Sequence, residues 1–145
     1  MTHLYTTGYQ GETIHEFIKK ISAEKIEAII DIRENPISRK PGFSKNTFQK
    51  KLDTVGIDYY HFQELGTPRP LRNLLATSQN YDKFFEEYKQ FLPEFQDALD
   101  DIVEMGSNKR ICLLCFEKDP HYCHRQIVAK IISYYTGREI FVVHI

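Results

Sequence analysis

Reactive side chains are concentrated in one short segment of the sequence, residues 115–125. This segment follows the apolar run 111–114 and precedes a helical pattern of apolar residues that starts at Ile127. Its side chains suited to catalysis or anion binding are Cys115, Glu117, Cys123, His124 and Arg125. Ligands of open α/β sheets bind where such a strand ends, and the N-terminus of the next helix favours anions and lowers the pKa of a nearby thiol. The segment therefore predicts a site for an anionic ligand or for thiol chemistry.

The three cysteines have different expected positions. Cys112 and Cys115 are three residues apart on a strand, so their side chains face opposite sides of the sheet. We expect Cys112 in the core, and Cys115 to share a site with Cys123, which lies four residues before Ile127 on the buried face of the helix. Cys115 and Cys123 then act either as nucleophile or metal ligands beside His124, or as buried packing residues.

Zinc, or another divalent metal, is the cofactor that this segment could bind. The side-chain types that zinc prefers are present in Cys115, His121, Cys123 and His124. Their spacing does not match a standard zinc motif, and two adjacent helical residues diverge by about a third of a turn. We therefore expect no cofactor and no metal ligand, with a zinc site as the alternative.

A second group of candidate residues surrounds the apolar strand 28–32. Asp31 could orient Arg33 or act as a base, and arginine presents a fork of donors that suits phosphate. Further arginines that could hold phosphate groups are Arg39, Arg69 and Arg72. Tyr9 and Glu64 follow two other strands and could also contact a ligand. The alternative is a structural pair of Asp31 and Arg33, with the other arginines solvated at the surface.

Charge is distributed unevenly along the chain, although the formal net charge is only −1. Residues 33–72 carry eight basic and four acidic side chains, whereas residues 80–106 carry eight acidic and two basic ones. Either these are two solvated faces, or the basic stretch forms a cleft for a phosphate or polyanion. The odd number of cysteines, three, argues against a disulfide framework and favours a reducing cytoplasm. The sequence holds no apolar run of the roughly 18 residues that a membrane span needs, so we expect no membrane partner.

Strand-like and helix-like segments alternate along the chain. Strands are expected at 4–7, 28–32, 57–62, 111–114 and 140–143, and helices at 13–21, 44–55, 81–102 and up to residue 135. Pro93 predicts a kink or two consecutive helices, residues 106–108 a turn, and Asp119-Pro120 the start of the last helix. This alternation predicts a single domain, residues 1–145, with a three-layer α/β/α fold and a mostly parallel sheet of about five strands. The unbroken apolar character of 111–114 predicts a strand at or next to the centre of the sheet.

Ordered motifs over nearly the whole chain carry a family resemblance. They are Thr7-Gly8-Tyr9, the stretch from Asp31 to Arg39, Gly56-Ile57-Asp58-Tyr59, Glu64-Leu65-Gly66, the stretch from Cys115 to Pro120, and Cys123-His124-Arg125. With these motifs the chain resembles the domain-of-unknown-function family 488, which consists of small bacterial and archaeal proteins. The resemblance implies an α/β fold and leaves the activity open.

Three functions are compatible with these residues. The first is an enzyme that acts on a phosphate-bearing substrate, a nucleotide or a nucleic acid, at the carboxyl edge of the sheet. The second is a thiol- or sulfur-handling enzyme that uses Cys115 and Cys123, and the third is a nucleic-acid-binding module without catalysis. We rank the first highest because carboxylates, histidine and arginines converge at one edge, where we expect them to line a single cleft. The expected catalytic residues are Asp31, Glu117, Cys115, Cys123 and His124, and the expected substrate-binding residues are Tyr9, Arg33, Arg39, Glu64, Arg69, Arg72 and Arg125.

Overall fold

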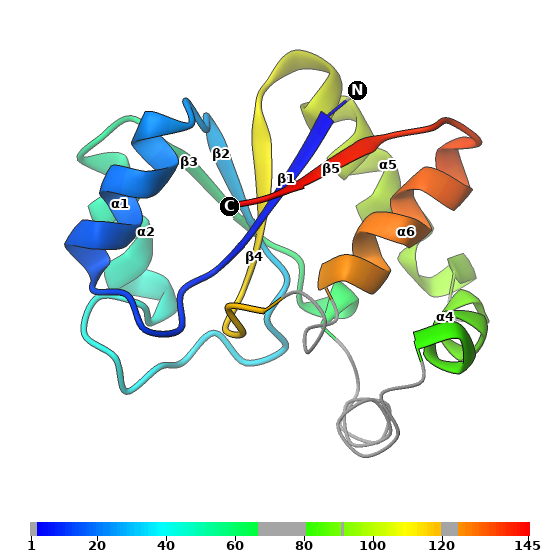
Figure 1. Ribbon diagram of the computed structural model, residues 1–145, viewed down its shortest axis with the longest axis horizontal. Coiled ribbons are helices and arrows are strands. Elements are labelled where there is room, and N and C mark those ends of the chain that lie inside the picture. The colour runs from blue at the N-terminus through cyan, green and yellow to red at the C-terminus, as the bar shows by residue number, and fades with distance from the viewer. Residues whose placement is uncertain (1–2, 67–80, 91, 120–124) are drawn as a thin grey trace.

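The protein is built around a five-stranded parallel sheet (Figure 1). The computed structural model describes residues 3–66, 81–90, 92–119 and 125–145. The strands are β1 (His3–Gly8), β2 (Ala28–Asp31), β3 (Asp58–His61), β4 (Ile111–Cys115) and β5 (Phe141–His144). Their order in the sheet is β3-β2-β4-β1-β5, and each neighbouring pair is parallel. The predicted fold class and the central position of the strand from Ile111 are therefore confirmed.

Helices cover both faces of this sheet and form the two outer layers (Figure 1). One face is covered by α1 (Ile14–Ala23) and α2 (Lys45–Asp53). The other face is covered by α4 (Tyr81–Lys89), α5 (Leu92–Asn108) and α6 (Arg125–Thr136). A short 3₁₀ helix, η1 (Gln63–Leu65), follows β3. In the described part of the chain, none of the helices is both long enough and apolar enough to cross a membrane.

Most helix boundaries follow from local sequence signals. Thr13 caps α1 through a capping box, because its hydroxyl accepts from the Glu16 N–H while the Glu16 carboxylate accepts from the Thr13 N–H. The break expected at Pro93 separates the two helices α4 and α5. The expected turn at 106–108 is wrong, because α5 continues to Asn108. The side chains of Ser107 and Asn108 bond to carbonyls one turn earlier and are compatible with the helix.

The start of α2 differs in detail from the expectation. Ser44 occupies the N-cap position, but its hydroxyl makes no capping bond. Instead it accepts from the Ser38 N–H and donates to the Ser38 carbonyl, at 3.0 and 3.1 Å. These two hydrogen bonds between Ser38 and Ser44 therefore stabilise the conformation of the loop between β2 and α2.

The sheet separates two hydrophobic cores. Alternate residues of the strands, such as Leu4, Ile30 and Leu113, pack towards α4, α5 and α6. The residues between them, such as Tyr5 and Ile29, pack towards α1 and α2. Every residue of β4 is buried, as expected for a strand covered on both faces.

The carboxyl end of β4 is a switch point of the topology. The chain leaves β4 towards α6 on one face, whereas it leaves the two neighbouring strands, β1 and β2, towards α1 and α2 on the other face (Figure 1). The loops that follow these strands therefore diverge. In the ladder Gly8 is opposite Cys115 and Asp31 is opposite Leu114, so the three strands end at nearly the same level. Ligands of open α/β sheets bind at such a point.

Candidate functional site

Asp31 and Arg33 form a buried ion pair directly after β2. Asp31 is fully buried and Arg33 is 6% exposed. The Arg33 guanidinium donates to both carboxylate oxygens, with Nη2 to Oδ2 at 2.7 Å and Nε to Oδ1 at 2.9 Å, and the Arg33 backbone N–H donates to Oδ1 at 3.0 Å. Burial alone would lower the pKa of Arg33, but the hydrogen bonds and the charge of Asp31 raise it well above its ordinary value. The pairing of Asp31 with an arginine, which the sequence predicted, is present.

Aromatic and backbone groups complete this first group. Arg33 Nη1 donates to the Phe43 carbonyl at 2.7 Å and to the Tyr9 hydroxyl at 3.2 Å. The Tyr59 hydroxyl donates to Asp31 Oδ2 at 2.5 Å, and burial beside that carboxylate raises the pKa of Tyr59. The His61 ring donates through Nε2 to the Arg33 carbonyl at 2.7 Å. We call Tyr9, Asp31, Arg33, Tyr59 and His61 the Arg33 cluster; it ties β1, β2 and β3 together at their carboxyl ends.

Arg125 organises a second group on the other face of the sheet. Its side chain is fully buried, and Nε donates to the Thr6 hydroxyl at 3.1 Å. Nη1 donates to the Glu117 carbonyl and to Cys115 Sγ, while Nη2 donates to the Lys118 carbonyl at 2.8 Å. The guanidinium thus holds the first turn of the loop after β4. This turn packs so closely on β1 that the facing residue, Gly8, must be a glycine. A Cβ atom on Gly8 would lie 1.7 Å from the Glu117 carbonyl oxygen.

The two arginines therefore lie on opposite faces of the sheet, and the expectation of one cleft lined by both is corrected. Arg33 continues the alternation of Ile29 and Asp31, which face α1 and α2. Arg125 begins α6, which covers the opposite face. Both groups nevertheless flank the carboxyl end of β4, one on each side of the switch point.

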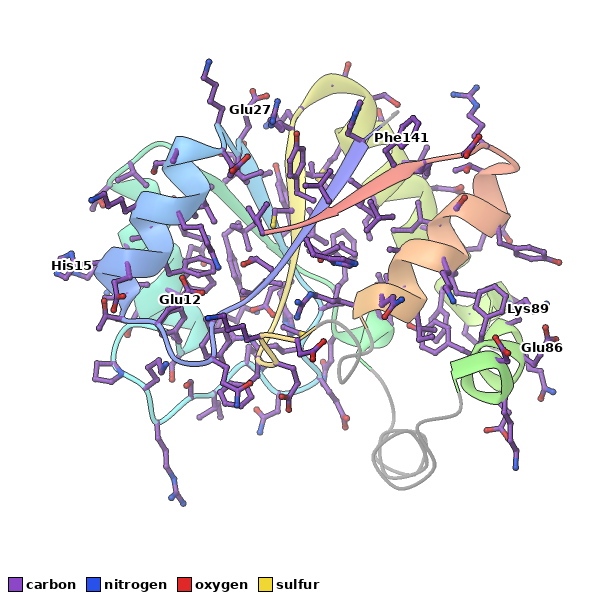
Figure 2. The ribbon with its side chains drawn as sticks, viewed as in Figure 1. Glu12, His15, Glu27, Glu86, Lys89 and Phe141 are labelled. Carbon is purple, nitrogen blue, oxygen red and sulfur yellow. The ribbon has the colours of Figure 1, made fainter. Side chains whose placement is uncertain are left out.

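The loop between β1 and α1, residues 9–13, connects the two groups. The Gln10 N–H donates to the Phe116 carbonyl at 3.0 Å, and the Lys118 N–H donates to Gln10 Oε1 at 3.2 Å. From the other side, Lys40 Nζ donates to the carbonyls of Tyr9 and Glu12 at 3.2 and 2.8 Å. Figure 2 labels Glu12 in this loop, between β1 and α1. The loop therefore brings Lys40 and Lys118 to the same edge of the sheet.

At this edge of the sheet, Glu117 is a carboxyl group with a shifted pKa. Its side chain is half-buried. Burial raises the pKa of Glu117, and the positive charge of Arg125 only partly offsets the increase. A carboxyl group whose pKa is raised keeps its proton to a higher pH than an ordinary carboxyl group, which suits it to act as a general acid.

The described cysteines are both buried. Cys112 is free and lies in the core on the α1 and α2 side, as predicted, and burial raises the pKa of its thiol. Cys115 is 2% exposed, packs on the opposite side and is disulfide-bonded. A disulfide at Cys115 was not expected from the odd number of cysteines. Within the described ranges, no group of three or more histidine, cysteine or acidic side chains is arranged to hold a metal ion.

The other predicted site residues are exposed or lie outside the described residues. Arg39 is exposed on the loop between β2 and α2, and Glu64 is exposed on η1 directly after β3. Outside the described residues lie Arg69, Arg72, His121, Cys123 and His124, together with the expected helix start at Pro120.

Sequence reasoning missed several members of the site. The sequence placed His61 at the carboxyl end of its strand and Tyr59 among tyrosines that could stack bases, but neither was predicted as a site residue, and Lys40 was only one charge in a basic loop. A usable signal was present for Tyr59, because it alternates with Ile57 on the face of β3 towards α2. Lys40 gave no such signal, because its partners are backbone carbonyls 28 and 31 residues away.

The family was identified by comparison with known proteins. The model of the family described as "Domain of unknown function DUF488" matches residues 13–132. The chain belongs to this family. The match includes the Arg33 cluster except Tyr9, and it includes Glu117 and Arg125. No curated protein and no solved structure shows significant similarity to the chain.

Proposed function

We propose that this protein is an enzyme that acts on a phosphate-bearing substrate, a nucleotide or a nucleic acid, at the carboxyl end of β4. The observation that carries the proposal is the arrangement around the switch point. A half-buried carboxyl group with a raised pKa, Glu117, follows β4 next to the buried Arg125 guanidinium, while the buried Arg33 guanidinium lies on the other face of the sheet. Structural ion pairs also perturb pKa values, but this combination lies at a topological switch point, the place where open α/β sheets bind ligands.

The buried residues act in this proposal by positioning others. Every nitrogen of the Arg33 side chain donates to an internal acceptor, and Asp31 is fully buried beneath it. Asp31 and Arg33 therefore hold the loop after β2, and Arg125 holds the loop after β4. Proton transfer falls to Glu117, a half-buried carboxyl group on the loop after β4.

Exposed cations supply the contacts to phosphate. Arg39 and Lys118 are exposed, and Lys40 is half-buried beside the Tyr9 carbonyl. On the same side of the sheet, α2 exposes Lys45, Lys50 and Lys51. Helices α4 and α5, whose sequences are rich in acidic residues, lie across the sheet from α2 (Figure 1). This charge separation favours the approach of an anion from the side of α2.

Substitution of Glu117 tests the enzyme proposal. Purified protein is assayed for turnover of nucleoside phosphates, a phosphodiester and a short single-stranded oligonucleotide, with Glu117→Gln compared to the matched control Glu94→Gln in α5. We expect Glu117→Gln to lower kcat at least about 100-fold with a smaller change in KM, as for loss of a general acid or base. Equal kcat values for Glu117→Gln and the parent, or the lack of turnover of every phosphate-bearing substrate, would refute the proposal.

A nucleic-acid-binding module without catalysis is the second candidate, and the exposed lysines of α2 favour it. Its signature is oligonucleotide affinity that falls steeply with salt concentration in the absence of turnover. The thiol-handling alternative receives less support, because Cys115 is buried and disulfide-bonded. A cytoplasmic location and the independence from a cofactor stay predictions.

A further inference from the structure

Phe116 is a large apolar side chain exposed at the candidate site. It directly follows β4 and is 44% exposed. A large aromatic ring that stays in solvent lacks the stabilisation that burial of its apolar surface would give. Its two neighbours in the chain, Cys115 and Glu117, are bound by Arg125 on one face of the sheet. By the alternation of the chain, Phe116 points to the opposite side, towards α1 and α2.

The ring of Phe116 is held by a rigid aromatic stack. Its centroid lies 5.3 Å from that of Tyr9 in an edge-to-face arrangement. Tyr9 is itself stacked on Phe43 with centroids 4.3 Å apart and an interplanar angle of 10°. Both supporting rings are buried, and the Phe116 carbonyl accepts from the Gln10 N–H. One part of the ring is thus fixed against the protein while the rest faces solvent.

Positive charges are attached to the same loop as this ring. Lys40 donates to the carbonyls of Tyr9 and Glu12, and the backbone of Lys118 is bound to Gln10. An exposed ring fixed against Tyr9, with the Lys40 ammonium bound to the Tyr9 carbonyl, matches a ligand that has both a flat aromatic part and a phosphate. Single-stranded nucleic acids and nucleotides are recognised by this combination of stacking and positive charge.

We infer that Phe116 is a stacking platform for an unpaired nucleobase, so that the substrate class is nucleobase-bearing rather than a simple phosphate ester. The inference rests on the proposed function, because it places the base of that substrate at the same edge of the sheet. The base lies against the exposed part of the Phe116 ring, and the phosphate is held by Lys40, Lys118 or Arg39. A mononucleotide and the unpaired end of a nucleic acid share this chemistry.

Equilibrium binding separates the base from the phosphate. The probes are adenosine monophosphate, ribose 5-phosphate, a single-stranded oligonucleotide and the same sequence as a duplex. The variants are Phe116→Ala, Phe116→Tyr and the control Phe141→Ala, which removes a ring that is 62% exposed on β5, at the amino end of the sheet beside His3. Figure 2 shows Phe141 well separated from Glu12.

The parent protein should bind adenosine monophosphate roughly tenfold tighter than ribose 5-phosphate, the contribution of one stacked base. Phe116→Ala should abolish this difference and keep the affinity for ribose 5-phosphate, whereas Phe116→Tyr and Phe141→Ala should retain the difference. Preference for the single strand over the monophosphate identifies a nucleic acid as the source of the base, and the reverse identifies a nucleotide.

Two results overturn the inference and are distinguishable. If ribose 5-phosphate binds but Phe116→Ala leaves the preference for adenosine monophosphate unchanged, the stacking platform is refuted and the proposed function stands. If none of the four probes binds the parent protein, the proposed function fails together with the platform.

Discussion

Substitution of Asp31 by asparagine should destabilise the protein strongly, because it removes the negative charge of the side chain and leaves the shape of the side chain nearly unchanged. In the native protein Asp31 accepts hydrogen bonds from the Arg33 backbone, from the Arg33 guanidinium and from Tyr59. Arg33 is 6% exposed and would stay charged, because its pKa is raised above an already high value. Removing one partner of such a buried pair costs about 3–5 kcal/mol, a large fraction of the roughly 5–15 kcal/mol that stabilises a typical domain.

A surface pair provides the matched control. Lys109 Nζ lies 2.5 Å from Asp58 Oδ2, with side chains that are 36% and 50% exposed. Because water screens this pair, Asp58→Asn should cost no more than about 1 kcal/mol. The two substitutions are chemically identical and differ in burial, so the difference between their effects isolates the contribution of the interior.

Urea unfolding at neutral pH measures both effects. The chain contains nine tyrosines and no tryptophan, so tyrosine fluorescence and far-ultraviolet circular dichroism are suitable probes. The slope of the free energy against urea concentration should be unchanged, which attributes a lower midpoint to stability alone. If Asp31→Asn and Asp58→Asn lower the free energy of unfolding by the same small amount, the Arg33 cluster does not anchor the edge of the sheet and the reasoning is wrong. The double variant Asp31→Leu/Arg33→Met should cost less than Asp31→Asn, because it leaves no buried charge.

Four further outcomes are expected. Gly8→Ala should lower the free energy of unfolding by about 1–3 kcal/mol in urea, because its Cβ displaces the Glu117 carbonyl; an unchanged midpoint contradicts this packing. Because folding raises the pKa of Glu117, the native state binds this proton more tightly than the unfolded chain, so its contribution to stability is present at low pH and is lost as pH rises above about 4.3; unfolding of Glu117→Gln at several pH values should lack this loss. Thr13→Ala should cost about 1 kcal/mol in thermal or urea unfolding through loss of the capping box, and a cost near zero would show that Glu16 caps the helix alone. Cys112 should resist alkylation at neutral pH until urea unfolds the protein, as followed by mass spectrometry, and rapid labelling of the native state would disprove its burial.

Much of the fold could be predicted from local patterns. The unbroken apolar run of β4 indicated a strand covered on both faces, and it is central and fully buried. Thr13 followed by Glu16 indicated a helix start, and Pro93 indicated the break between α4 and α5. These signals are reliable because each depends on residues within a few positions of one another, where the helix or strand period alone decides which side chains meet.

The candidate site was only partly predictable. The sequence placed Asp31, Arg33 and Glu117 at strand ends and Arg125 at the start of the last helix, and the pairing of Asp31 with Arg33 required a separation of only two residues. The long-range partners of this ion pair, Tyr59 and Tyr9, could not be inferred from the sequence. They lie in β3 and directly after β1, and the order of the strands in the sheet differs from their order in the chain.

The sequence by itself determined the elements, their polar ends and the central strand, whereas the tertiary structure decided which face each polar end serves. Arg33 and Arg125 both follow buried strands, yet they lie in different cores. The physical reason is that side chains alternate across a strand, while the face taken by the next helix depends on the direction in which the chain crosses to another strand. That direction reverses after β3, and the reversal is a property of the strand order that no local pattern of residues contains.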